Sequence, residues 1–74
     1  MMIKMIANID EAECIITLTD GSIWMINPGE LSAAVCWQPS QKVKLTKAML
    51  GSFFTHEMIN EDNMDQRVLV RKRT

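Results

Sequence analysis

Hydrophobic and polar residues alternate along much of this chain, and the alternation predicts short β-strands. Residues 42–47 read Lys-Val-Lys-Leu-Thr-Lys, which places Val43 and Leu45 on one face and the lysines on the other. Val68 and Val70 alternate with longer or charged residues in the same way near the end of the sequence. No stretch has the 3.6-residue period of a long amphipathic helix. The chain is therefore predicted to be all-β.

An Asp-Gly pair between two apolar runs predicts a β-hairpin, because glycine readily adopts the positive φ that a tight turn needs. Two registers are open. A two-residue loop would pair Leu18 with Ile23 and place Trp24 on a face with threonines. A three-residue loop would pair Ile16 with Trp24 and put Gly21 in the left-handed conformation as a bulge.

We favour the three-residue loop because one face of the hairpin then holds four large apolar side chains: Ile16, Leu18, Trp24 and Ile26. A slip of one residue would move that whole set to the opposite face. In this register Ile23 and Met25 point outward.

The segment after the hairpin predicts a short helical turn. Asn27 is a suitable N-cap, Pro28 has the φ required at the first helical position, and the Glu30 carboxylate can reach back to the backbone of the cap. The buried side of this turn is predicted to consist of Leu31, Ala34 and Val35, with Trp37 following it.

Two further strands complete the prediction. Residues 1–9 alternate, and we expect an inward face made of Ile3, Met5, Ala7 and Ile9. Residues 53–60 offer two faces, of which we favour an inward one made of Phe54, His56, Met58 and Asn60. Five or six strands and one helical turn in 74 residues predict a single domain, residues 1–74, folded as a small antiparallel β-barrel.

Charge is divided unevenly along the chain although the net charge is −1. One basic residue against five acidic ones gives residues 1–37 a charge of −4, and seven against four gives residues 38–74 a charge of +3. We expect the two halves to interleave in a closed barrel, so that most of this asymmetry cancels. No apolar run reaches the roughly 20 residues that span a bilayer, and the first residues do not resemble a signal peptide. The protein is therefore predicted to be cytoplasmic.

The barrel prediction agrees with a resemblance that covers residues 18 to about 71. Its motif is Leu18-x-Asp20-Gly21-Ser22-x-Trp24-x-Ile26-x-Pro28, then Trp37-x-Pro39, Val43-x-Leu45, Met58-x-Asn60 and Val68-x-Val70. This pattern resembles that of a group of short uncharacterised bacterial proteins. The resemblance implies an SH3-like small barrel and implies no catalytic activity.

The side chains that carry catalytic or metal chemistry are sparse. His56 is the only histidine, so an imidazole mechanism or a histidine pair for a metal has a single residue to draw on. Cys14 and Cys36 lack zinc-ligand spacing, and we expect two buried thiols, with a disulfide or a reactive cysteine as alternatives. No glycine-rich phosphate loop is present. We therefore predict no catalytic residues, no metal site and no cofactor, and a protein that is not an enzyme.

Two surfaces remain as candidates for binding. Exposed apolar residues predict self-association through the first strand or the outer side of the hairpin, with Met2, Ile6, Ile23 and Met25 as the contact residues. A candidate anion-binding surface consists of Lys42, Lys44, Arg71, Lys72 and Arg73. The tryptophans could form a peptide groove, but core packing is favoured because so small a barrel needs its largest side chains inside. Phe53 is then the aromatic side chain expected to be exposed.

These features predict a binding or assembly module whose ligand is a protein partner or a second copy of the chain, with no role for a membrane. The alternative is a nucleic-acid-binding barrel of the Sm or OB type, which the low pI of about 5.7 disfavours. The two functions differ in their salt dependence. An apolar protein contact is insensitive to salt, whereas a phosphate contact weakens steeply.

Overall fold

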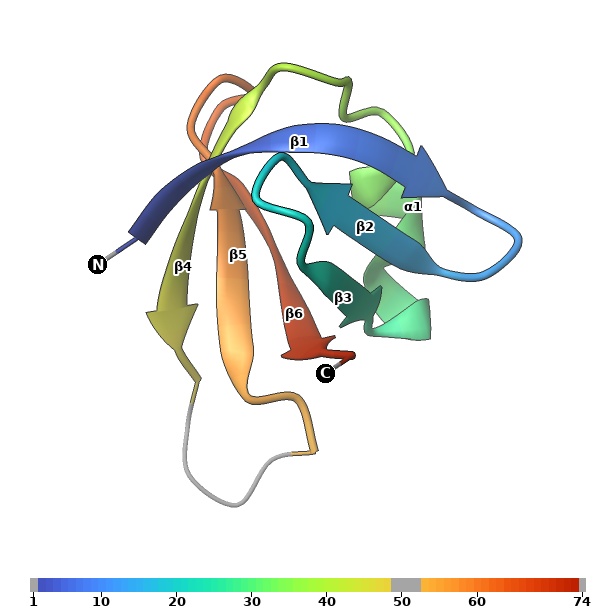
Figure 1. The fold of residues 1–74 in the computed structure, drawn as a ribbon. Helices are drawn as coiled ribbons and strands as arrows, with labels where there is room; N and C mark the ends of the chain where they lie inside the picture. The colour runs from blue at the N-terminus through green and yellow to red at the C-terminus, as the bar shows by residue number, and fades with distance from the viewer. Residues whose placement is uncertain (1, 49–52, 74) are drawn as a thin grey trace.

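Six antiparallel strands close into a barrel in the computed structural model, which describes residues 2–48 and 53–73 (Figure 1). The strands are β1 (Met2–Asp10), β2 (Ile15–Leu18), β3 (Ile23–Ile26), β4 (Lys42–Lys47), β5 (His56–Asn60) and β6 (Gln66–Lys72). A 3₁₀ turn (Pro28–Glu30) leads into helix α1 (Leu31–Ala34) between β3 and β4. The predicted antiparallel barrel with one short helical turn is thus confirmed. Among the described residues, no helix is both long and apolar enough to cross a membrane.

The strand order around the barrel is β1-β2-β3-β6-β5-β4, and β4 pairs with β1 to close it. Strands β1 to β3 are successive neighbours, and β4 lies on the other side of β1, which is the Greek-key arrangement. Strands β4 to β6 are likewise successive neighbours, and β3 lies beside β6. Each half of the chain therefore forms one continuous half of the barrel. The expectation that the two charged halves interleave is wrong, because the three strands of each half are contiguous and the halves meet only where β1 pairs with β4 and β3 with β6.

The central hairpin has the favoured three-residue loop. Ile16 pairs with Trp24, the Leu18 N–H donates to the Ser22 carbonyl at 2.9 Å, and Gly21 has a φ of +89°. No atom lies within 4 Å of a Cβ built on Gly21, so its backbone conformation, and not crowding, explains the glycine.

The barrel interior holds a continuous apolar cluster to which every strand contributes. Its buried members are Ile6, Ile16, Leu18, Trp24, Ile26, Ala34, Trp37, Val43, Leu45, Met58, Val68 and Val70. Both tryptophans belong to this core, as predicted, and both keep a hydrogen bond: Nε1 of Trp24 donates to Ser22 Oγ at 2.9 Å, and Nε1 of Trp37 donates to Gln66 Oε1 at 3.1 Å. A peptide groove built on the tryptophans is therefore not what the fold provides.

Strand β1 presents the face opposite to the predicted one over its first part. Ile3 and Met5 are 57% and 43% exposed, whereas Ile6 is 1% exposed and pairs with Leu18. A bulge between Ile6 and Asn8 then shifts the register, so that Ile9 faces Ile16 and packs against the core. Simple alternation fails here because one extra residue reverses the two faces in mid-strand.

The helical turn begins as predicted, with the Asn27 side chain accepting from the Gly29 N–H at 3.2 Å. The Glu30 carboxylate does not return to the backbone of the cap. It accepts from the Asn27 side-chain amide at 3.3 Å and from the Leu69 N–H at 2.8 Å, which ties the turn to β6. Val35 was predicted to be buried and is 38% exposed, because the helix ends at Ala34 and its buried side is covered by Ala34 and Leu31.

Strand β5 begins at His56, three residues later than the alternation predicts. Met58 and Asn60 face inward as expected and are fully buried, while His56 and Phe54 are only half-buried. Strands β4 and β6 bury the predicted valines and leucine. Of residues 2–48 and 53–73, Asn60 is the polar residue that is buried, and its amide donates to Gln41 Oε1 at 2.8 Å.

Candidate binding pocket

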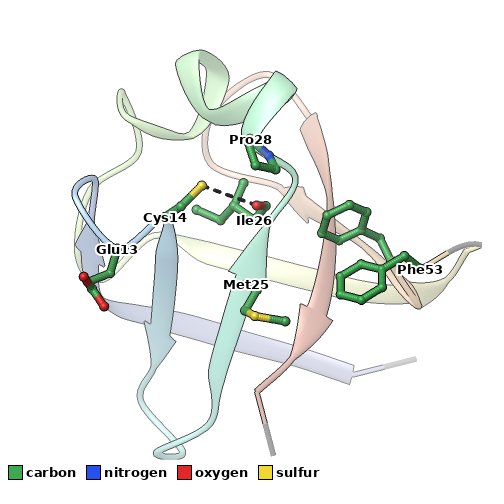
Figure 2. A pocket seen from close by; sticks show the side chains of 7 residues that line it. Glu13, Cys14, Met25, Ile26, Pro28 and Phe53 are labelled. Atoms are coloured by element: carbon green, nitrogen blue, oxygen red, sulfur yellow. Dashed lines mark hydrogen bonds between the residues drawn. The ribbon is translucent and has the colours of Figure 1, made fainter.

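A pocket of about 230 Å³ opens beside the outer side of β3 (Figure 2). It lies between the β1–β2 turn, the start of the 3₁₀ turn and the residues that precede β5. Its lining consists of Glu13, Cys14, Met25, Ile26, Pro28, Phe53 and Phe54. We call this site the Phe53 pocket. Apart from Glu13 at one side, these side chains are apolar or weakly polar, so the pocket favours an apolar occupant.

Phe53 and Phe54 form one wall of the Phe53 pocket, and Arg71 packs against Phe53. The Phe53 ring stands edge-on to the Phe54 ring, with centroids 5.0 Å apart, and is 61% exposed. The Arg71 guanidinium lies 4.8 Å from the Phe53 ring centroid and donates to the Phe53 carbonyl at 2.9 Å. Arg71 is also the cross-strand partner of Met25, whose side chain extends toward Phe53 in Figure 2. The exposed aromatic wall is thus held in place by a cation that contacts Phe53.

Cys14 closes the opposite side of the pocket. Its thiol points at the Ile26 carbonyl and donates to it at 3.3 Å (Figure 2), and its backbone has a positive φ of 58°. Cys36 lies beyond α1 and is exposed. Both cysteines are free. The prediction of two buried thiols is therefore wrong for Cys36, because the chain leaves the core after α1 and returns to it only at Trp37, and Cys14 is only partly buried.

The size of the pocket limits what it can bind. Pockets for drug-sized ligands and cofactors usually enclose about 300–1,000 Å³, and the Phe53 pocket is smaller. A single large side chain of a protein suits it better, in the way that anchor residues fill pockets at protein interfaces. His56 does not line it: this ring packs edge-on against Trp24 at 5.2 Å, with Nδ1 2.9 Å from Thr55 Oγ1. Within residues 2–48 and 53–73, no three metal-ligating side chains converge on a point.

The structure separates the four residues predicted for self-association. Met25 lines the Phe53 pocket, and Ile23 is half-buried on the same outer side of β3. Ile6 is buried in the core and is not available to a partner, because the β1 bulge turns it inward. The side chain of Met2 lies outside the described residues. The exposed apolar residues of β1 are instead Ile3 and Met5.

The five basic residues predicted for anion binding fall into two groups. Lys42 and Lys44 lie on β4, and Lys44 is 4.0 Å from Glu61. The other group lies at the far end of β6 and just beyond it: Arg71, Lys72 and Arg73. Lys44 is level with Arg67 through Ile59 of β5, so a full strand and about 13 Å along β6 separate the groups. They do not form one continuous patch.

A cluster of polar side chains lies at the turn between β2 and β3. The Asp20 carboxylate accepts from Ser22 Oγ at 2.6 Å and from the Ser22 N–H at 2.9 Å, and Lys4 Nζ lies 2.9 Å away. These hydrogen bonds hold the pKa of Asp20 well below its ordinary value. The largest contribution comes from the Ser22 side chain, and the next comes from Lys4. Since every polar group here has a partner within the chain, the cluster is structural.

Sequence reasoning identified only part of the pocket. It placed Met25 on the outer side of the hairpin and expected Phe53 to be exposed, and both predictions are confirmed. It did not bring Cys14, Pro28 or Phe54 to the same site. The adjacent phenylalanines were the one signal available, because two neighbouring large rings in the strand predicted there cannot both face the core.

Comparisons of this chain with protein-family models, with curated proteins and with solved structures give no match. The pocket is therefore interpreted from its own geometry.

Proposed function

We propose that this protein is a non-enzymatic binding or assembly module that engages a protein, either a partner or a second copy of itself, through the Phe53 pocket. The observation that supports the proposal most strongly is the exposed Phe53 ring, 61% accessible and held beside an apolar pocket by Arg71. Large aromatic side chains of a small barrel are normally kept inside, as both tryptophans are here. An exposed aromatic wall beside a pocket is typical of a protein contact.

The alternative proposal is a nucleic-acid-binding barrel. Single-strand binding proteins combine a continuous basic groove with several exposed aromatic rings on which bases stack. Here the basic residues lie in two separate groups, and Phe53 and half-buried Phe54 are the aromatic side chains outside the core among the described residues. This arrangement supports the protein-binding proposal over the alternative. A cytoplasmic location and the SH3-like resemblance remain parts of the same proposal.

Site-specific photocrosslinking tests the proposed function. Benzoylphenylalanine placed at residue 53 puts the reactive group at the pocket wall, and the same amino acid at Val35, exposed on α1's C-terminal side, is the matched control. We expect a discrete protein adduct in cells of the native host from position 53 and not from position 35. Equal adducts from the two positions, or an adduct to nucleic acid, would contradict the proposal. Binding of short oligonucleotides that weakens steeply with salt would favour the alternative.

A further inference from the structure

Met64 is the most exposed large apolar side chain among the described residues, at 92% accessible. It lies in the turn between β5 and β6, residues 61–65, where acidic residues surround it. Its φ of 55° is in the left-handed region, which favours glycine or asparagine and disfavours methionine. Neither hydrophobic burial nor backbone preference explains a methionine at this position.

The Phe53 pocket has the properties that would accommodate this side chain. It has room for one large apolar group, and two phenylalanine rings line it. Methionine is unbranched and adaptable, and its thioether makes favourable contacts with aromatic rings. Arg71 lies against Phe53 of the lining, while Asp65 follows Met64 directly and has no hydrogen-bonding or ion-pair partner among the described residues. The exposed methionine therefore matches the pocket in size and apolar character, and the neighbouring Asp65 has the charge opposite to that of Arg71.

Met64 cannot reach the pocket of its own chain. Met64 lies in the turn before β6, whereas Arg71 is the second-last residue of that strand, and the five residue steps of extended chain from Gln66 to Arg71 span about 17 Å. Figure 1 shows the β5–β6 connection and the residues before β5 at opposite ends of the barrel. The two elements can meet only between two molecules.

We propose that Met64 of one protomer occupies the Phe53 pocket of a second protomer, with Asp65 beside the second protomer's Arg71. This inference rests on the proposed function and names a second copy of this chain as the occupant. The local charges support that choice, because Asp65 in the acidic turn of one molecule would lie beside Arg71 of the other, on the side of the pocket away from Glu13. Because the two contact surfaces differ and lie at opposite ends, each molecule uses one surface on either side, and the contact propagates as a chain of molecules.

Sedimentation velocity of the full chain tests this arrangement. We expect the weight-average sedimentation coefficient of the wild type to rise steadily from micromolar to millimolar concentration, because a small contact binds weakly. Met64→Asn should remain monomeric over the same range, and asparagine suits a positive φ, so this variant keeps its fold. Val35→Asn, the same replacement of an exposed apolar side chain on α1's C-terminal side, should associate like the wild type. A strictly monomeric wild type, or a Met64→Asn variant that associates normally, would overturn the inference.

Mixing two variants that do not self-associate distinguishes a contact between two different surfaces from a symmetric contact. Met64→Asn keeps the pocket and loses the methionine, whereas Phe53→Ser keeps the methionine and loses the pocket wall. Each should be monomeric alone, and together they should form a 1:1 heterodimer that does not grow further. Absence of the heterodimer would contradict the proposal.

A charge exchange tests the contribution of Asp65 and Arg71. Arg71→Glu should weaken association about tenfold, and adding Asp65→Lys in the partner variant should restore it. Arg67→Gln, a change on the same outer face of β6 but beside Glu57, is the control and should have little effect. If residue 53 crosslinks to a different protein while the wild type stays monomeric, the occupant is that protein; the self-association inference then fails and the proposed function stands.

Discussion

Lys4 Nζ lies 2.9 Å from a carboxylate oxygen of Asp20, across the end of the barrel. Lys4 occupies an inward-facing position of β1, opposite the buried Val43 of β4. Its aliphatic stem extends along the barrel wall and brings the ammonium to the hairpin turn, where the charge has a partner and stays partly solvated. A charged residue is thus accommodated on the core side of a strand because the barrel end is near.

The Asp20 cluster predicts a loss of stability at low pH. The folded-state pKa of Asp20 is depressed below the ordinary value of 3.8, chiefly by Ser22 and then by Lys4. A depressed pKa contributes stability that is present above the unfolded pKa and is lost as the pH falls toward the folded one. We therefore expect the stability difference between wild type and Asp20→Asn to shrink below about pH 4.

An NMR titration of the Asp20 carboxyl carbon checks this directly. Asp20 should remain ionised below the pH at which an ordinary aspartate is half-protonated. Ser22→Ala should shift its midpoint back upward, since it removes the first cause of the depression. A wild-type midpoint near 3.8 would show that the hydrogen bonds do not persist in solution.

The two faces of β1 predict losses of stability of very different size for two isoleucines. Ile6→Ala removes a side chain that is 1% exposed and should reduce the free energy of unfolding by about 2–4 kcal/mol. Ile3→Ala changes a side chain that is 57% exposed and should cost less than about 0.5 kcal/mol. Urea denaturation of the two variants measures the difference. The alternation in the sequence, taken without the bulge, predicts the reverse order.

This strand shows why part of the fold was predictable and part was not. Strands β4 and β6 alternate without interruption, and the hairpin carries a glycine at the one position that needs a positive φ, so local sequence determines both. In β1 a lysine occupies an inward-facing position, so the pattern of apolar residues does not identify the face that packs on the core. The bulge near Ala7 then exchanges the inward and outward faces within the strand. Both features depend on distant residues, Asp20 and the strands paired on either side.

The pocket was less predictable than the fold, because its residues meet only through the strand order. Cys14 and Phe53 are 39 positions apart in the sequence and come from turns that no local pattern relates. The same applies to charge. Interleaving of the two halves was a reasonable expectation for a barrel, but the Greek-key order places all of β1 to β3 together. Periodicity predicts strands; it does not specify which strands become neighbours.

Buried Asn60 predicts a specific stability cost. Its amide donates to Gln41 Oε1, and its side-chain oxygen accepts from the Asp62 N–H at 2.9 Å, so it links the loop before β4 to the turn after β5. Asn60→Ala should lower the free energy of unfolding by about 1–3 kcal/mol, because it leaves these groups without their partner. Asn63→Ala, in the same turn and outside the core, should change it by less than about 0.5 kcal/mol. Equal effects in thermal or urea denaturation would argue against a structural role for the buried amide.

The two cysteines provide a reporter for the pocket. Cys36 is exposed and should react rapidly with a thiol reagent such as DTNB, whereas Cys14 is partly buried, donates to Ile26 and should react about tenfold more slowly. Cys36→Ser should remove the fast phase, and Cys14→Ser the slow one.

Because Cys14 lines the Phe53 pocket, any occupant of the pocket should slow its reaction further. With Cys36 replaced by serine, the Cys14 rate should therefore fall as the protein concentration rises, while adding Met64→Asn should make it independent of concentration. If the reaction rate of Cys14 does not depend on protein concentration in either variant, any self-association that is measured uses a different surface of the barrel. A rate that falls only in the protein that retains Met64 links the pocket and the methionine in a single measurement.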